Sequence, residues 1–250
     1  MIHTLIYENW NQFKSTFYKD LFSQDLFLSN IFIFRGQSNG DWPLISSFDR
    51  WYDKLIYKEN RKTIASGLID YFLNECYDPI LLKEISANQD IGIAMAQHYG
   101  VPTRLLDWSE SPYIAAFFSF IDCLENFEEF DPVSIWALRL DSPIFSSKNA
   151  RVVKCPKIYN DRLRNQKGLF TLLETEHASI NDLVLANSCS ASLVRALIPS
   201  TEAVHALSDL SAMGITAASL FPDYVGAAIA AKVSMALARI GEHVIGGPTK

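Results

Sequence analysis

The stretch over residues 97–112 holds the side chains of this chain that are best suited to chemistry, in the order QHYGVPTRLLDWSESP. Arg104 and Asp107 lie three positions apart, and burying either charge is costly unless it is paired. Trp108 adds an aromatic ring and Ser109 a hydroxyl group. Irregular segments commonly carry binding and catalytic groups, so this run is the first candidate for a site.

Helix signals flank the run on both sides, and we therefore expect a short loop between two helices. On the N-terminal side, Asn88 or Asp90 can cap a helix over residues 91–99, and Gly100 is suited to end it. On the C-terminal side, Ser111 stands before a proline and an apolar stretch, which is typical of an N-cap followed by the first helical residue.

The start of the second helix suggests a ligand for this loop. Free backbone N–H groups and the positive end of the helix dipole attract anions. Arg104 and Ser109 lie close by in sequence, so we predict a site for a phosphate or a carboxylate. The alternative for Arg104 and Asp107 is an ion pair that braces the loop.

A second candidate site element is the segment NIFIFRG over residues 30–36. Its apolar, β-branched and aromatic residues predict a short buried strand that delivers Arg35 at its end. A charged side chain at the end of an apolar strand must meet an anion, and the internal candidates are Asp107 and Asp223. Gly36 is expected to mark a backbone position with positive φ.

The remaining pattern predicts an α+β fold, with helices mainly in the N-terminal half packed on a mixed β-sheet. Helices are expected over residues 8–30 and 50–85, the second broken near Pro79. Strands are expected at 132–140, 168–173 and 193–198. A helix over 201–213 should end at Gly214, and residues 225–240 are interpreted as a core helix, with a partner-binding helix as the alternative.

Composition restricts the classes of protein and site. The 250 residues are 49% hydrophobic and 20% charged, which indicates a globular chain. The net charge of −6 argues against broad nonspecific binding to nucleic acid. A local basic patch at 148–167, including Arg151 and Arg162, could hold one, although a solvated loop is the more ordinary interpretation.

Several absences in the sequence are also informative. The chain has no GxGxxG, Walker or HExxH motif, and its four cysteines lie too far apart for a CxxC metal knuckle, so no metal site is expected. The first residues lack the pattern of a signal peptide, and residues 225–240 are too short to span a bilayer. We expect a cytoplasmic protein that does not enter a membrane.

Four blocks together resemble the FRG domain family, a bacterial group named for its Phe/Tyr-Arg-Gly motif. The blocks are Phe34-Arg35-Gly36-Gln37, residues 97–112, Gln166-Lys-Gly168-Leu-Phe170-Thr171, and the segment from Gly214-Ile215 to Leu220-Phe221-Pro222-Asp223. The second block contains AQHYGVPTRLLDW, which is long enough to be specific. The resemblance implies one domain over 1–250, with a helical extension at 1–30 and a C-terminal helical segment at 201–250.

The resemblance also implies a function. Proteins with this domain resemble effector modules of bacterial conflict systems, and an arginine on an early strand resembles the first motif of ADP-ribosyltransferases. The chain is thereby interpreted as an NAD-dependent toxin or effector of a toxin-antitoxin or anti-phage defence system, with a split sheet. It would transfer ADP-ribose to RNA, DNA or protein, and an antitoxin or inhibitory protein would restrain it.

The same resemblance implies roles for particular residues. In that superfamily an arginine or histidine holds NAD, a Ser/Thr motif follows on a later strand, and a glutamate stabilises the ribosyl cation. The predicted catalytic residues, which would fill these positions or supply the acid in their place, are Arg35, Thr103, Asp107, Glu174 and Glu176. The predicted NAD-binding residues are Phe34, Arg35, Gly36, Gln37, His98, Tyr99, Arg104, Trp108, Ser109, Gln166 and Asp223.

Two departures from the superfamily pattern leave an alternative open. Residues 102–108 are expected to form a loop rather than a Ser-Thr-Ser strand, and Glu174 and Glu176 lie outside the four blocks. His98, on the apolar face of a helix, is more typical of a packing residue than of a base. The alternative function is a noncatalytic module that binds a nucleotide or nucleic acid.

Overall fold

The computed structural model describes residues 1–22, 31–56, 60–76, 82–83, 85, 88–124, 132–154 and 161–245, without the side chains of Asp161, Leu163 and residues 239–245. The strands are β1 (His3–Ile6), β2 (Phe32–Gln37), β3 (Leu105–Ser109), β4 (Val133–Arg139), β5 (Ala150–Val153), β6 (Gly168–Leu173) and β7 (Leu193–Ile198). The α-helices are α1 (Trp10–Leu21), α2 (Ser47–Tyr52), α3 (Arg61–Asn74), α5 (Gln89–His98), α6 (Pro112–Phe120), α7 (Asp161–Asn165), α8 (Ile180–Ala186), α9 (Ala203–Ala212), α10 (Ala217–Leu220) and α11 (Tyr224–Ile245). Short 3-10 helices are η1 (Ile121–Leu124), η2 (Pro143–Phe145), η4 (Ser190–Ser192) and η5 (Ser200–Glu202).

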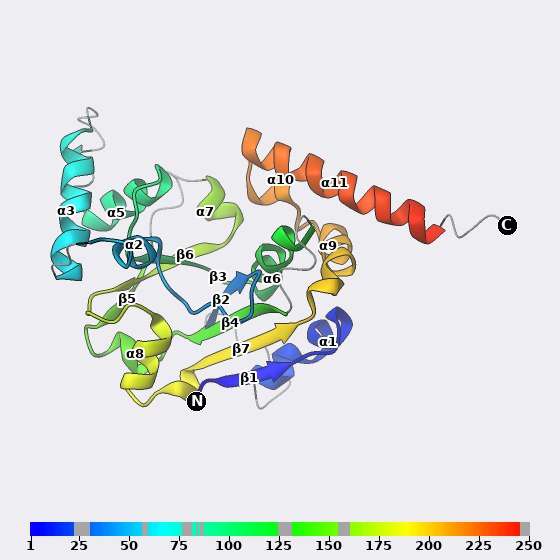
Figure 1. Ribbon diagram of the computed structural model, residues 1–250, viewed down its shortest axis with the longest axis horizontal. Helices are drawn as coiled ribbons and strands as arrows, with labels where there is room; N and C mark the ends of the chain where they lie inside the picture. Colours follow the sequence, from blue (N-terminus) through cyan, green and yellow to red (C-terminus); the bar gives the residue numbers. More distant parts are fainter. Residues whose placement is uncertain are drawn as a thin grey trace.

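The strands form one mixed sheet in the order β1-β7-β4-β2-β3-β6-β5, which confirms the α+β class (Figure 1). β1 pairs with β7 in parallel, and the other neighbouring strands are antiparallel. The strands β1 and β5 were not expected from the sequence. Helices α8 to α11 follow residue 173, so the expected concentration of helices in the N-terminal half is met only in part.

The sheet is nearly divided between its two central strands. β2 pairs with β4 along its whole length, and β3 does the same with β6. Between β2 and β3, however, the only paired residues are Phe34 and Ser109. The sheet therefore consists of two segments joined at one residue pair.

Residues 105–109 form the strand β3, and the expectation of a loop here was wrong. The local signals on either side were interpreted correctly, because Asn88 caps α5 and Ser111 caps α6. Between them, the side chains of Leu105, Leu106 and Trp108 are buried. Pairing with β6, some sixty residues away, stabilises the extended chain, and tertiary contacts of this kind override local preference.

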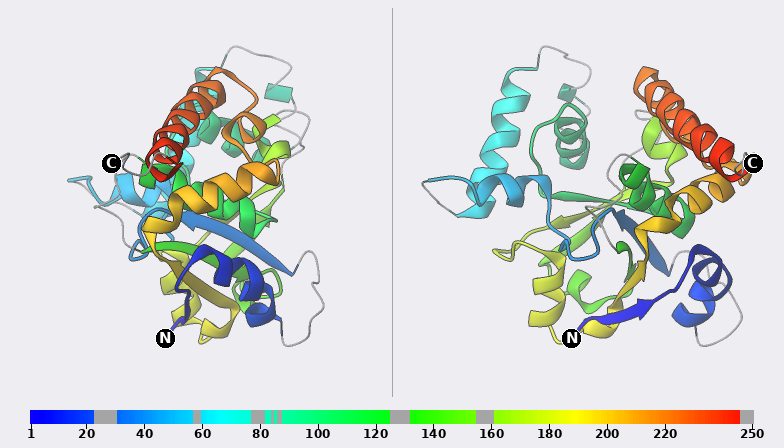
Figure 2. Two further views of the ribbon diagram at one scale, coloured as in Figure 1. Left: turned by 90° about the vertical axis from the view of Figure 1, so that its right-hand side faces the viewer. Right: turned by 45° about the vertical axis from the view of Figure 1, so that its right-hand side comes forward.

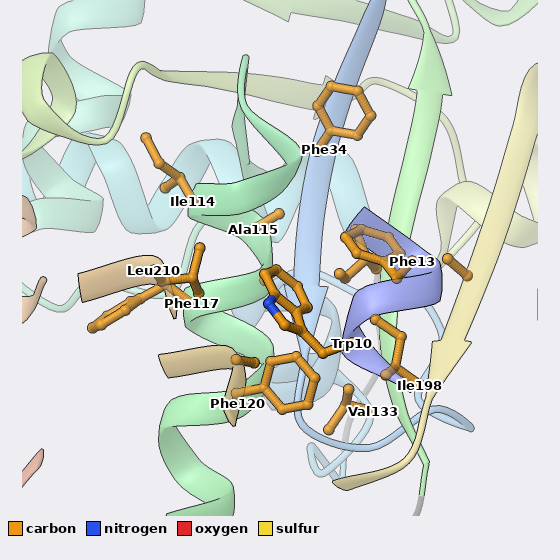
Figure 3. Close-up of a cluster of buried hydrophobic side chains, with 14 of the residues drawn as sticks. Trp10, Phe13, Phe34, Ile114, Ala115, Phe117, Phe120, Val133, Ile198 and Leu210 are labelled. Atoms are coloured by element: carbon orange, nitrogen blue, oxygen red, sulfur yellow. The ribbon is translucent and has the colours of Figure 1, made fainter. Parts of the chain in front are cut away.

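Helices pack on both faces of the sheet. On one face, aromatic and aliphatic residues of α1, α6 and α9 cover β2, β4 and β7 (Figure 3). Trp10 stacks on Phe13 at 5.4 Å between ring centroids and meets the edge of Phe120 at 6.0 Å. The opposite face of the sheet packs against α8. In a separate cluster, α5 covers part of β3, β5 and β6.

The helix α11 is not the core helix that its apolar composition suggested. Figures 1 and 2 show it at the periphery of the molecule, and Tyr224 and Met235 are 95% and 60% exposed. Only one side of it, including Ile229 and Ala230, packs on the core. When a helix has apolar residues on all sides, its composition alone does not show that only one side packs against the rest of the molecule. None of the described helices combines the length and apolarity needed to cross a bilayer.

Other expectations meet the structure in different ways. Of the helix expected over 8–30, the structure contains α1 over Trp10–Leu21. Residues 23–30 lie outside the described residues, and so does the expected break near Pro79. Gly214 ends α9 with a φ of 79°, as expected, and Gly100 follows α5 with a φ of 88°. Gly36 does not have a positive φ, so that expectation was wrong.

Gly36 is instead a packing requirement. A Cβ atom at this position would lie 1.9 Å from the backbone oxygen of Ala115 and 2.5 Å from Oγ of Ser119. The backbone of α6 therefore lies directly on β2, and only glycine fits between them. This close approach fixes α6 beside Arg35.

Substitution of Gly36 by alanine is expected to lower the free energy of unfolding by about 1–3 kcal/mol, because the added methyl group forces α6 away from β2. Urea denaturation measures the change. The matched control is Gly67→Ala in α3, where nothing lies within 4 Å of the new Cβ. This control should gain about 0.5–1 kcal/mol from the removal of a helical glycine. A similar response of both variants would contradict the packing argument.

Candidate functional site

A cavity of about 630 Å³ opens where β2 and β3 separate, and its size is typical of a small-molecule site. Its walls come from β2, β3, α6 and the turn after β2. The lining residues are Phe34, Arg35, Gly36, Gln37, Ser38, Trp42, Pro43, Ile45, Arg50, Asp107, Trp108, Ser109, Ala115, Phe118, Asp122 and Gln166.

Arg35 spans the division of the sheet. Its Nη1 donates a hydrogen bond of 2.8 Å to the backbone oxygen of Asp107 and lies 3.7 Å from the carboxylate of the same residue. The Arg35 side chain is 21% exposed and that of Asp107 is 62% exposed. Of the two internal anions considered from the sequence, Asp107 is therefore the partner. Nε of Arg35 is buried and has no acceptor among the residues that the structure describes.

A second arginine lines the same cavity. Arg50 belongs to α2, is exposed, and donates through Nη1 to the backbone oxygen of Ile45 at 2.6 Å. Burial lowers the pKa of Arg35, the charge of Asp107 raises it, and the charge of Arg50 lowers it again. Two guanidinium groups at one cavity favour an anionic ligand.

A smaller hollow of about 210 Å³ adjoins the same three charged residues. Arg35, Arg50 and Asp107 line it as well as the larger cavity, together with residues of α5 and β3. The charged groups thus lie where two hollows meet. This arrangement suits a ligand with charge in its middle and bulk at its ends.

Asp107 is held by a short relay of side chains. Gln97 donates from Nε2 to Oδ1 of Asp107 at 2.8 Å, and its Oε1 accepts a hydrogen bond from Oγ1 of Thr103. Thr103 is buried and does not line the larger cavity. Its hydroxyl group therefore orients Gln97, which in turn orients the carboxylate.

Arg104 is a structural residue, and it does not pair with Asp107. It is 4% exposed and contacts Asp49, with 3.3 Å between Nη2 and Oδ1. It also donates to the backbone oxygens of Thr175 and His177. The ion pair considered between Arg104 and Asp107 was therefore wrong in both partners, because Arg104 pairs with Asp49 and Asp107 lies beside Arg35.

Several predicted residues line the cavity but use their polar atoms internally. Nε1 of Trp108 donates to Thr171 at 2.9 Å, and Oγ of Ser109 donates to the backbone oxygen of Gln166 at 2.7 Å. Oε1 of Gln37 accepts from Nε1 of Trp136 at 2.7 Å. These contacts stabilise the wall, while Phe34 and Gly36 shape it.

Other predicted residues do not line either of these hollows. His98 and Tyr99 are exposed at the end of α5. Glu174 follows β6 and lies four positions beyond Phe170, the partner of Asp107, which is about 13 Å along a strand. It pairs with Arg151 at 3.2 Å.

The last two predicted acids are also engaged elsewhere. Glu176 accepts from the backbone N–H of Arg61 at 3.4 Å. Asp223 accepts from Nε of Arg162 at 2.7 Å and caps α11 through the N–H of Gly226, and these contacts lower its pKa. Asp107 is therefore the only one of the predicted acids that lines the cavity.

The start of α6 does not face the cavity, in contrast to the anion site expected there. Ser111 caps the helix and Pro112 is its first residue, as predicted. The wall takes Ala115 and Phe118 from the middle of α6 and Asp122 from η1. The division of the sheet places the cavity beside the helix rather than at its end.

Sequence reasoning missed eight of the lining residues, namely Ser38, Trp42, Pro43, Ile45, Arg50, Ala115, Phe118 and Asp122. Trp42 is 46% exposed, and a tryptophan next to a proline in a polar turn is the one signal that the sequence offered. Oγ of Ser38 donates to Oδ2 of Asp122 at 3.3 Å. Arg50 and Asp122 have no distinguishing sequence context, because only the fold brings them to β2.

Two arginines of the basic patch expected at 148–167 form ion pairs in the part of it that the structure describes. Arg151 contacts Asp90 at 2.6 Å as well as Glu174, and Arg162 contacts Asp223. Lys157 lies outside the described residues. The range also contains β5 and α7, so the interpretation as a solvated loop holds only in part. Within the described part of the chain, no three His, Cys, Asp or Glu residues cluster as metal ligands.

The fold and the cavity define an α+β domain whose divided sheet presents an arginine to a ligand-sized cleft. Residues 30–127 match the sequence profile of the FRG domain, and the chain contains an FRG domain. The match includes both β2 with Arg35 and the run over residues 97–112, whereas the blocks at 166–171 and 214–223 lie outside it. Neither a curated protein nor a solved structure matches the chain.

Proposed function

We propose that the cleft between β2 and β3 binds NAD, and that the protein transfers ADP-ribose to a macromolecule as a toxin or effector of a bacterial toxin-antitoxin or anti-phage defence system. One observation carries the proposal. Arg35 and Asp107 meet across the division of the sheet, at a cavity that Arg50 also lines. An antitoxin or inhibitory partner that restrains the activity belongs to the same proposal.

The charges and rings of the cavity suit the parts of NAD. Arginine binds phosphate through paired donors, so Arg35 and Arg50 are assigned to the pyrophosphate. Trp42 and Phe118 offer aromatic surface on which a base can stack. The two adjoining hollows give the ligand room on either side of the charged centre.

Asp107 is assigned to the chemical step. The bond between C1′ of the ribose and N1 of nicotinamide breaks, and its electron pair leaves with nicotinamide, which becomes neutral. Positive charge develops on the ribose, and the exposed carboxylate of Asp107 stabilises it. An oxygen or nitrogen of the acceptor then bonds to C1′, and its proton passes to a carboxylate or to water. Gln97 keeps Asp107 in place throughout.

The test uses the purified chain and NAD labelled in its adenylate half, incubated with cell extract, RNA or DNA. We expect label on an acceptor or the release of nicotinamide. No binding of NAD together with no product would overturn the proposal. Binding without turnover would instead support the alternative, a noncatalytic nucleotide-binding module, which the engagement of Glu174 and Glu176 outside the cavity favours.

The variant Trp42→Ala tests the assigned stacking. Loss of one base–aromatic contact is expected to raise KM for NAD about tenfold, or about 1.4 kcal/mol, with kcat little changed. Steady-state release of nicotinamide measures both constants. Tyr71→Ala is the matched control, because Tyr71 is also an exposed aromatic residue but belongs to α3 and lines neither hollow. An equal effect of the two variants would remove Trp42 from the site.

A further inference from the structure

Besides the two hollows that Arg35 lines, a mostly apolar hollow of about 370 Å³ lies between α6, η1 and α11. Its apolar wall includes Phe117, Ile121, Phe221, Ile229 and Val233. Two further residues, Phe118 and Asp122, line both this hollow and the candidate NAD cavity. The apolar hollow and the candidate NAD cavity therefore adjoin at these side chains.

We infer that this apolar hollow binds an apolar side chain of a protein acceptor and thereby brings the acceptor's nucleophile to Asp122. The inference rests on the proposed function, because an acceptor is required only if ADP-ribose is transferred. It narrows the acceptor from any macromolecule to a protein. It also gives α11 a role, since this helix forms one side of the hollow.

The chemistry of the lining favours protein over nucleic acid. Nucleic-acid binding draws on several cations that contact successive phosphates. Of the described residues that line this hollow, only Lys232 is cationic. Apolar pockets of this kind hold the anchor residues of protein interfaces. Tyr224 and Val225, at the start of α11, are further exposed apolar side chains.

Asp122 lies where a nucleophile would enter from this side. It is exposed, and Ser38 holds one carboxylate oxygen by a hydrogen bond of 3.3 Å. As the acceptor's oxygen or nitrogen bonds to C1′ and the C1′–N1 bond breaks, the other carboxylate oxygen takes the proton of the attacking group. Asp107 and Asp122 thus divide the work between the ribose and the acceptor.

The first test compares Val233→Glu with Met235→Glu in the full chain. Val233 lines the hollow, whereas Met235 lies on the same helix, is 60% exposed and does not line it. We expect Val233→Glu to lower label transfer to extract proteins about tenfold or more, as for the loss of an interface anchor, with hydrolysis of NAD to ADP-ribose unchanged. Met235→Glu should match the wild type. If Val233→Glu melts at a lower temperature, Val233→Thr replaces it.

A second test needs no NAD. A phage-displayed library of random dodecapeptides is selected on the immobilised full chain, and fluorescein-labelled 20-nucleotide RNA and DNA strands serve as the competing probes. We expect enriched peptides to share an aromatic or aliphatic residue and to lose affinity for Val233→Glu but not for Met235→Glu.

The outcomes separate the two ideas. Peptides that bind both variants equally, or label that appears on nucleic acid at the same rate with both variants, would overturn the assignment of the hollow. If the peptides behave as expected but NAD is neither bound nor cleaved, the proposed function falls, and the hollow stays a peptide-binding site of another activity.

Discussion

The variant Asp49→Asn is expected to lose about 3–5 kcal/mol of unfolding free energy, because it leaves buried arginine charge without its counterion. Asp49 is fully buried and contacts Arg61 at 3.0 Å and Arg104 at 3.3 Å. It also accepts from Oγ of Ser46, the cap of α2. Guanidinium chloride denaturation at neutral pH measures the loss.

An exposed pair in the same protein provides the control. Arg139 and Asp141 approach to 2.6 Å, with 45% and 63% of their side chains exposed. Solvent screens such a pair, so Asp141→Asn should cost no more than about 1 kcal/mol. Equal losses in Asp49→Asn and Asp141→Asn would contradict the difference in burial on which the prediction depends.

This network matters for the cleft as well as for stability. Asp49 joins α2 to α3 through Arg61 and to the start of β3 through Arg104. The next residue along α2 is Arg50, which lines the cavity. Loosening of Asp49 should therefore weaken ligand binding along with the fold, even though Asp49 itself does not line the cavity.

The parts of the structure that depend on local chemistry were predictable. The strands β2, β4, β6 and β7 coincide with apolar runs that end at turn residues. The caps of α5 and α6 were evident from Asn88 and from Ser111 before Pro112. In each case the signal lies within a few residues of the element, so one sequence is enough to detect it.

The parts that depend on distant partners were not predictable. β3 owes its extended form to β6, and Arg104 owes its burial to Asp49, which is 55 residues away. Of the candidate site, Arg35 and Asp107 were found because an arginine at the end of an apolar strand requires an anion. Arg50 was missed, because nothing near it shows that the turn after β2 folds back over the cleft.

Substitution of Arg35 by alanine is expected to weaken NAD binding by about 2–4 kcal/mol, or about 30- to 1000-fold, since it removes a desolvated charge from the ligand. Isothermal titration with NAD measures the change. Arg139→Ala is the control, because Arg139 is an exposed arginine at the end of β4 and does not line the cavity. Cells that express the wild-type chain should lose viability, and Arg35→Ala should restore it.

Asp107→Asn separates binding from chemistry at the same pair. The amide keeps the shape of the carboxylate but not its charge, so NAD should still bind while its cleavage slows by about 100- to 1000-fold in single-turnover experiments. Wild-type cleavage by this variant would remove Asp107 from the chemical step.

A purely structural Arg35 predicts a different pattern. In that case Arg35→Ala lowers the free energy of unfolding, and Asp107→Asn, which loses the same ion pair, lowers it by a comparable amount. In the proposed site, Nε of Arg35 has no acceptor among the described residues, and its Nη1 contacts a backbone oxygen that Asp107→Asn leaves in place. The double variant then distinguishes the two roles, because a coupling energy in NAD cleavage without one in stability assigns the pair to the ligand.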